Sequence, residues 1–176
     1  MLKIRKAEQH NIAEVDAIYT EILRYEEEHT KYTVFELGVY PTRQTAEKAF
    51  AENSLFVLEQ HGQVYASIIV NQMQPAEYQE VHWNCDAAPE EVMVIHLLCV
   101  SPTRAGQGLW TAMVKFVETL AKERNCKVVR LDTGAQNIPA VSLYQKLGFK
   151  IADTATMAIG GIISHKNHLF LELTLG

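Results

Sequence analysis

The sequence has few cysteines. It contains three, Cys85, Cys99 and Cys126, which lie far apart and form no CxxC pair. An odd number of scattered cysteines provides neither a disulfide framework nor a zinc site. His165 and His168 are three residues apart but have no further ligands nearby in the sequence, so we expect no metal. Reduced thiols are typical of the cytoplasm, which is the compartment we expect.

Positive charge and long apolar runs are also lacking. The formal net charge is −5, which disfavours a protein whose main task is to hold nucleic-acid phosphates. No run approaches the roughly 18 apolar residues of a membrane span. The residues after Met1 contain no apolar stretch of about 7–15 residues, so we expect no signal peptide. We therefore expect neither a nucleic-acid partner nor a membrane partner.

The remaining composition is that of an ordinary globular protein. The chain has 176 residues, of which 48% are hydrophobic and 21% charged. This size and composition predict a single domain over residues 1–176. The apolar periodicity predicts secondary structure along the whole chain. Strands are expected at 2–7, 55–59, 64–70, 91–100, 128–131, 149–159 and 168–173, and helices at 12–28, 43–50, 109–124 and 139–147.

The order of these elements indicates the fold class. The strand at 55–59 and the strand at 64–70 form a hairpin around the turn His61-Gly62-Gln63. Later strands alternate with helices. Antiparallel strands that pass into strand–helix–strand units predict an α/β (α+β, mixed) sheet with helices on both faces.

One loop has the composition of an anion-binding site. Residues 100–109, VSPTRAGQGL, join the strongly apolar strand at 91–100 to the start of a helix. The N–H groups of a first helical turn lack intrahelical acceptors, and the helix dipole favours an anion there. Gly106 and Gly108 allow the backbone to approach a ligand closely. The alternative is that the two glycines only make a tight turn. The loop is neither a P-loop nor a dinucleotide fingerprint, because GK[ST] and GxGxxG are both absent.

Two segments together resemble a known family. The loop at 100–109 resembles the pyrophosphate loop of the GNAT superfamily, the CoA-dependent N-acyltransferases. Residues 137–149, NIPAVSLYQKLGF, are similar to that family's second signature. The resemblance implies a GNAT-like seven-stranded mixed sheet and acetyl-CoA as co-substrate. It also allows a homodimer.

The resemblance implies a set of cofactor-binding residues. The pantetheine arm is expected to pair with the strand through Leu98, Cys99 and Val100, and Asn137 is expected to contact this arm. Two positions depart from the family pattern. Ala105 stands where Gln or Arg is usual, and Trp110 stands where a small residue is usual, so the indole either crowds the pyrophosphate or turns into the core. Backbone N–H groups are expected to hold the pyrophosphate at Ala105, Gly106, Gln107, Gly108, Leu109 and Trp110.

Acyl transfer to an amine requires a base and an acid. An alkylammonium with a pKa of about 10.4 is about 3.4 units from neutral at pH 7, or about 4.6 kcal/mol. His96 lies within an apolar strand and has the intrinsic pKa of a base, and the arylalkylamine branch of the superfamily has a His here. The alternative is a buried structural histidine. Tyr144 matches the tyrosine that family members often use as general acid to the departing sulfur; the alternative is a half-buried tyrosine bonded to water. Cys99 points to the other face from His96 and is expected to be a core residue rather than a nucleophile.

Several polar residues have two interpretations each. Glu26, Glu27 and Glu28 end the first long helix, where they form either a solvated face or an acidic attraction for an amine. Asp132 and Thr133 end a strand shortly before Asn137, where they either orient the site or only bond the loop.

These observations predict an acetyl-CoA-dependent N-acetyltransferase. The enzyme would move an acetyl group to the primary amine of a small molecule by direct attack on the thioester. Two alternatives stay open. One is a CoA-binding regulatory module without catalysis, motivated by Ala105 and Trp110. The other is acetylation of a protein or peptide, which the acidic chain would suit.

Overall fold

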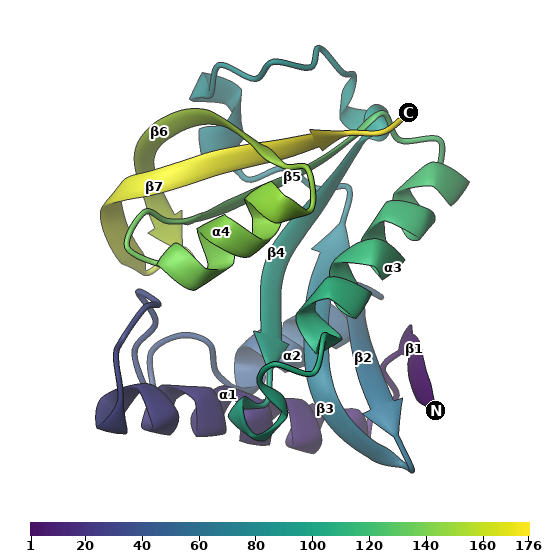
Figure 1. Ribbon diagram of the computed structural model, residues 1–176, viewed down its shortest axis with the longest axis vertical. Coiled ribbons are helices and arrows are strands. Elements are labelled where there is room, and N and C mark those ends of the chain that lie inside the picture. Colours follow the sequence, from purple (N-terminus) through teal and green to yellow (C-terminus); the bar gives the residue numbers. More distant parts are fainter. The chain divides into compact units, whose positions relative to one another are not determined.

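The computed structural model describes all 176 residues (Figure 1). The elements follow the order predicted from the sequence. The helices are α1 (Asn11–Glu28), α2 (Arg43–Ala51), α3 (Leu109–Glu123) and α4 (Ile138–Lys146), with short 3₁₀ helices η1 (Ala76–Glu80), η2 (Pro89–Glu91) and η3 (Pro102–Arg104). The strands are β1 (Leu2–Lys6), β2 (Leu55–Gln60), β3 (Gln63–Asn71), β4 (Val92–Val100), β5 (Val128–Gly134), β6 (Lys150–Ile159) and β7 (Ile163–Thr174).

The strands form one mixed sheet. Their hydrogen-bonded order is β1-β2-β3-β4-β5-β7-β6. The β4–β5 pair is parallel, whereas β1–β2, β2–β3, β5–β7 and β6–β7 are antiparallel. The predicted α/β class is confirmed. Internal contacts divide the chain into two compact units, the first made of residues 1–31, 35–70 and 97–116 and the second of residues 32–34, 71–96 and 117–176.

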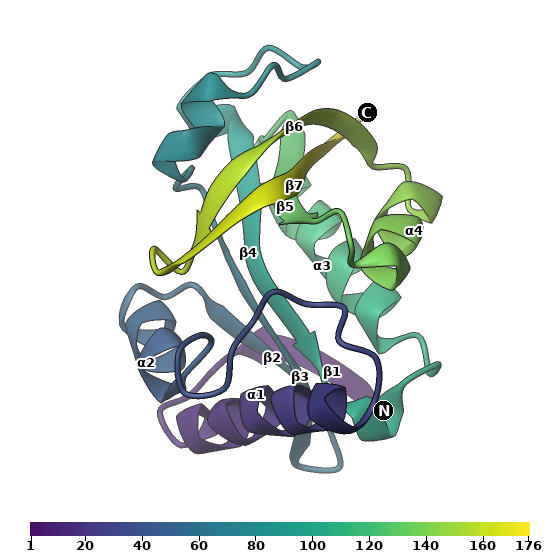
Figure 2. The ribbon, with the colours of Figure 1, turned by 90° about the vertical axis from the view of Figure 1, so that its left-hand side faces the viewer.

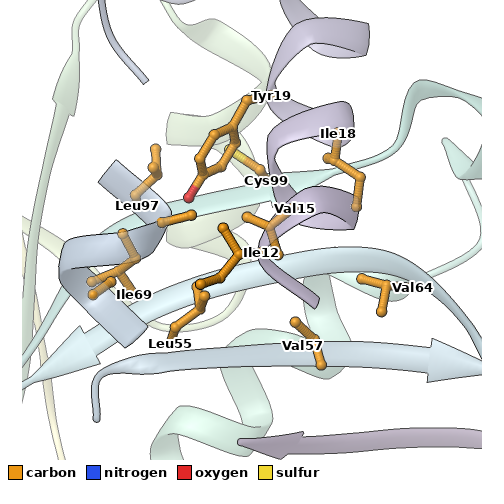
Figure 3. Close-up of a cluster of buried hydrophobic side chains, with 12 residues drawn as sticks. Ile12, Val15, Ile18, Tyr19, Leu55, Val57, Val64, Ile69, Leu97 and Cys99 are labelled. Carbon is orange, nitrogen blue, oxygen red and sulfur yellow. The ribbon is translucent and has the colours of Figure 1, made fainter. Parts of the chain in front are cut away.

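The first unit has helices on both faces of its strands. Leu55 and Val57 of β2 point into an apolar cluster beneath α1 and α2 (Figure 3). Phe56, on the opposite face of the same strand, contacts Phe116 of α3 with ring centroids 5.2 Å apart. Because side chains alternate along a strand, β2 packs against α1 and α2 with one face and against α3 with the other. The cluster also contains Ile12, Val15, Ile18, Tyr19, Ala46, Ala49, Val64, Ile69, Leu97 and Cys99.

Local sequence signals set the ends of two helices. Thr42 precedes α2 and forms a capping box with Thr45, whose hydroxyl oxygen accepts the Thr42 N–H at 3.0 Å. Gly148 follows α4 with φ of 99°, the left-handed conformation that glycine adopts without strain. The sequence predicted a helix that begins at residue 43 and a helix that ends at residue 147, within one residue of these two ends. None of the helices has the length and hydrophobicity of a membrane-spanning segment.

The second unit contains a long hairpin, β6–β7, of which β7 lies beside β5 (Figure 2). Two of these strands are longer than predicted. β5 continues to Gly134 instead of residue 131, and β7 begins at Ile163 instead of residue 168. The added residues are mostly polar, and backbone pairing with neighbouring strands extends the ladder there. An apolar pattern marks burial rather than pairing, so it missed these residues.

Candidate active site

The glycine loop links β4 to α3 within the first unit. Gly106 and Gly108 have φ of 76° and 77°, and a Cβ built on either would meet no atom within 4 Å. The two glycines are therefore required by backbone conformation and leave the loop open to a ligand. α3 begins at Leu109, immediately after the second glycine. The N–H groups of this first turn and the open loop fit a phosphate group.

Side chains fix both ends of this loop. Ser101, at the end of β4, donates its hydroxyl to Glu21 of α1, and its backbone N–H donates to the Tyr65 carbonyl oxygen at 2.8 Å. Ser101 Oγ also accepts the Thr103 N–H at 3.3 Å. The loop therefore leaves β4 from a point that is attached to both α1 and β3.

Arg104 is oriented toward the β2–β3 hairpin. Its guanidinium lies 3.8 Å from the centre of the Tyr65 ring and donates to Gln60 Oε1 at 3.0 Å. The same nitrogen donates to Gln107 Oε1 at 3.1 Å. These contacts engage the positive charge of Arg104. Arg104 precedes Ala105, the position at which the family usually has Gln or Arg. With Arg104 engaged in this way, the backbone N–H groups of the loop are its candidate donors to an anion.

Trp110 occupies the second position of α3. Its side chain is half-buried, and its indole nitrogen is buried away from solvent. A buried indole nitrogen favours the second of the two orientations considered above, in which the ring turns inward.

Leu97 and Cys99, in the second half of β4, line the α1 face of the first unit. Cys99 belongs to the apolar cluster and is 3% exposed. Burial, reinforced by the negative charge of Glu26, raises the pKa of the Cys99 thiol to about 12. A thiol with a raised pKa is protonated at neutral pH, which disfavours its action as a nucleophile. Leu98 is also buried and Val100 is half-buried.

The acidic run at the end of α1 is not uniformly solvated. Glu27 and Glu28 are exposed, but Glu26 is buried. Glu26 lies seven residues after Tyr19 and three after Leu23, so helical periodicity places it on their buried stripe. The interpretation of the run as a solvated face is therefore wrong for Glu26.

The other predicted residues lie in the second unit. Asn137 precedes α4, and its side-chain oxygen accepts the Ala140 N–H at 3.4 Å. The Asn137 amide NH₂ is the part of this side chain that can donate to a ligand. Tyr144, on α4, is 4% exposed and packs edge-on against Phe149. It is thus more deeply buried than the half-buried tyrosine of the alternative interpretation.

His96 is held by an asparagine that no sequence pattern indicated. Its Nε2 lies 2.6 Å from Asn71 Oδ1, at the end of β3. The same oxygen accepts the Met73 N–H at 2.9 Å, which identifies it as the carbonyl oxygen of the amide. Nε2 of His96 must therefore donate, and the lone pair of a neutral His96 is on Nδ1. His96 is half-buried.

A hydrogen-bonded group that contains His165 and His168 lies at the end of β5. The sequence did not indicate the bonds within this group. Tyr78 donates to Asp132 Oδ1 at 2.7 Å, and Asp132 Oδ2 lies 3.2 Å from His168 Nε2. His168 Nδ1 lies 2.9 Å from His165 Nδ1. Asp132 therefore bonds two side chains rather than only the following loop. The three-residue spacing of the histidines was the one available signal.

These features define a mixed α/β protein in which an open glycine-containing loop joins a strand to the start of a helix. A sequence model of the acetyltransferase (GNAT) family matches residues 13–149. The chain belongs to this family.

Curated relatives match only part of the chain. An uncharacterized N-acetyltransferase of Methanocaldococcus jannaschii is 32% identical over 71 residues, which is 40% of this chain and 31% of that protein. A streptothricin acetyltransferase of Escherichia coli is 33% identical over 69 residues, 39% of this chain and 36% of that protein. The chain thus matches about a third of the length of each of these relatives.

Solved structures share the whole fold. A Salmonella typhimurium protein solved with its cofactor acetyl-CoA has a TM-score of 0.68, with 18% identity over 99% of this chain and 94% of that chain. This likeness confirms the predicted GNAT-like fold.

Proposed function

We propose that the protein is an acetyl-CoA-dependent N-acetyltransferase that acetylates the primary amine of a small molecule. The observation that carries the proposal is the open glycine loop at the start of α3, in a chain of the GNAT family. The proposal covers residues 1–176 as one N-acetyltransferase domain in the cytoplasm.

The proposed cofactor contacts are mostly backbone contacts. The loop from Ala105 to Trp110 would hold the pyrophosphate through N–H groups, because Arg104 is occupied by Tyr65 and Gln60. The strand residues Leu98, Cys99 and Val100 would pair with the pantetheine arm. The NH₂ group of Asn137 would donate to the same arm.

Two side chains are assigned to proton transfer. Tyr144 is proposed as the general acid that protonates the departing sulfur, and its burial against Phe149 restricts the orientation of its ring. His96 is proposed as a base through Nδ1, because Asn71 holds Nε2 as the donor. A fixed tautomer makes the histidine ready to accept a proton without rearrangement.

The transfer is proposed to be direct. The amine nitrogen attacks the thioester carbonyl carbon, the C–S bond breaks, and the sulfur receives a proton. The high pKa and burial of Cys99 argue against an acyl-cysteine intermediate. The streptothricin acetyltransferase among the relatives supports a small-molecule acceptor.

Isothermal titration calorimetry with acetyl-CoA, followed by a screen of amines, tests the proposal. We expect saturable binding at one site and CoA release with at least one of 2-phenylethylamine, spermidine and L-lysine. Binding without turnover of any amine or peptide would favour the non-catalytic CoA-binding module. Higher kcat/KM for peptides than for free amines would favour a protein acetyltransferase.

A further inference from the structure

Four side chains of the second unit form a continuous hydrogen-bonded chain. It runs from His165 through His168 and Asp132 to Tyr78, with heavy-atom distances of 2.9, 3.2 and 2.7 Å. Two members are well shielded, since His168 is 3% exposed and Tyr78 is 2% exposed. The side chain of Asp132, which lies between them, is 14% exposed. His165 is half-buried and forms the outer end. A chain with one accessible end and a half-buried carboxylate can receive a proton from outside.

The acceptors along this chain determine its tautomers. A carboxylate accepts hydrogen bonds, so His168 Nε2 carries a proton toward Asp132. In neutral His168 the Nδ1 atom is then an acceptor, and His165 must donate its own Nδ1 proton to it. The lone pair of neutral His165 is consequently on Nε2. A proton that arrives at this Nε2 can be passed on through Nδ1 to His168, where the cation faces Asp132.

The electrostatic surroundings favour this arrangement. Burial and the neighbouring His168 lower the pKa of His165, which keeps it neutral near pH 7. Burial and the charge of Asp132 raise the pKa of Tyr78 well above its usual value, so Tyr78 stays a donor. On β6, the residues opposite His165 and His168 are Met157 and Ala155, which carry no charge. Arg130 on β5 and Glu77 on η1 also act electrostatically on Tyr78, and Lys166 follows His165 on β7.

The chain lies close to a residue already assigned to the cofactor. His168 of β7 pairs with Gly134, the last residue of β5, and the Ala135 N–H donates to the Asn167 carbonyl oxygen at 2.8 Å. Asn137 follows two residues after Ala135 and begins α4. The hairpin thus brings both histidines to the end of the strand from which Asn137 leads into α4, within the same unit.

The proposed reaction releases more protons than one base accounts for. An alkylammonium has three N–H protons and the amide product has one, so two must leave the nitrogen. One ends on the sulfur of CoA, and the other goes to solvent. His96 and Tyr144 account for the proton that reaches sulfur: His96 accepts one N–H proton from the attacking nitrogen, and Tyr144 donates one proton to the sulfur. The proton that goes to solvent needs its own acceptor.

We propose that His165, positioned by His168 and Asp132, is the base that takes this proton from the acceptor ammonium and returns it to solvent. The proposal rests on the proposed N-acetyltransferase function. His165 Nε2 takes the proton of the ammonium, and the Nδ1 proton moves to His168. The neutral amine then attacks the thioester. The half-buried His165 releases the proton to water before the next turnover.

The kinetic test compares pH profiles of kcat/KM with the best of the three named amines. His165→Gln should lower kcat/KM at pH 7 by about 100-fold, the lower range for general base catalysis. The loss should shrink as the pH approaches the pKa of the amine, about 10.4, because solution then supplies neutral amine. Asp132→Asn should give a loss with the same pH dependence. The acetyl-CoA affinity of His165→Gln should not change.

His82→Gln is the matched control. His82 belongs to the same unit, its side chain is 93% exposed, and it pairs with Asp153 instead of the histidine chain. Its pH profile should match that of the wild type. A wild-type profile for His165→Gln, or a loss of equal size at every pH, would overturn the proposal.

Nitrogen-15 NMR of the imidazole rings tests the chain without turnover. The expected tautomers at pH 7.5 are Nε2–H for His168 and Nδ1–H for His165, and the opposite tautomer of either would also overturn the proposal. Failure of the wild type to bind acetyl-CoA or to acetylate any amine would instead refute the proposed function. The NMR result then decides alone whether the proton chain exists.

Discussion

Replacing Gly106 with alanine separates backbone strain from ligand binding. Gly106 has φ of 76°, and Gly62 in the β2–β3 turn has the same φ. A Cβ at either position would meet no atom within 4 Å. The two substitutions therefore impose the same conformational strain without a steric clash. Only Gly106 lies in the loop proposed to hold the pyrophosphate.

The expected destabilisation follows from this geometry. A left-handed conformation costs an L-residue about 1–2 kcal/mol. Alanine also reduces the entropy of the unfolded chain, which offsets about 0.4–1 kcal/mol of this cost. We expect a net loss of about 1 kcal/mol in the free energy of unfolding for each variant. For a domain of this size, this lowers Tm by about 2–4 °C.

Urea unfolding measures the stability of each variant, and calorimetric titration measures its affinity for acetyl-CoA. Both variants should lose the same stability, but Gly106→Ala should bind acetyl-CoA at least about 10-fold more weakly, or about 1.4 kcal/mol. The reason is that its Cβ projects from backbone that must approach the pyrophosphate closely. Wild-type affinity in Gly106→Ala, or an equal loss of affinity in Gly62→Ala, would refute the reasoning.

Three further predictions concern single side chains. Tyr144→Phe should lower kcat by about 100-fold with unchanged acetyl-CoA affinity, because it removes only the proposed acid. Steady-state kinetics measure kcat and calorimetry measures the affinity. An unchanged kcat would contradict the prediction. Iodoacetamide at pH 8 should modify half-buried Cys85 but not buried Cys99, whose pKa is about 12, and mass spectrometry of peptides distinguishes them. His165→Gln should flatten the pH dependence of stability below about pH 6.5. The pKa of His165 is lowered in the folded wild type, so the unfolded chain binds more protons below this pH, and the wild type loses stability as the pH falls. The variant lacks this contribution. Urea unfolding of wild type and variant at pH 5 and 7.5 checks the sign, and a wild-type pH dependence in the variant would contradict it.

The sequence was most informative where local chemistry determines structure. The end of α4 at Gly148 and the capping of α2 at Thr42 depend on residues within one helical turn. The glycine loop is similarly local, since Gly106 and Gly108 alone create its backbone conformation. Apolar periodicity likewise placed α1 within one residue at its start.

Contacts between distant segments could not be predicted. Asn71 reaches His96 across 25 positions, and Tyr78 reaches Asp132 across 54. No regular spacing in the sequence marks Asn71 or Tyr78 as a partner, because each pair is brought together by strands and loops that become neighbours only in the folded chain. Glu26 shows the same limit in another form. Its charge suggested exposure, but the helical stripe on which it lies decided its burial.

The hydrogen bond between Ser101 and Glu21 constrains how α1 can evolve. It joins positions 80 residues apart and attaches the start of the glycine loop to a helix of the same unit. Divergence at Glu21 would disturb the loop unless position 101 changed with it, so we expect these two positions to covary. Glu27 and Glu28 of the same helix are exposed. We therefore expect the outer face of α1 to vary rapidly in sequence, while Glu21 is conserved because it bonds a distant loop.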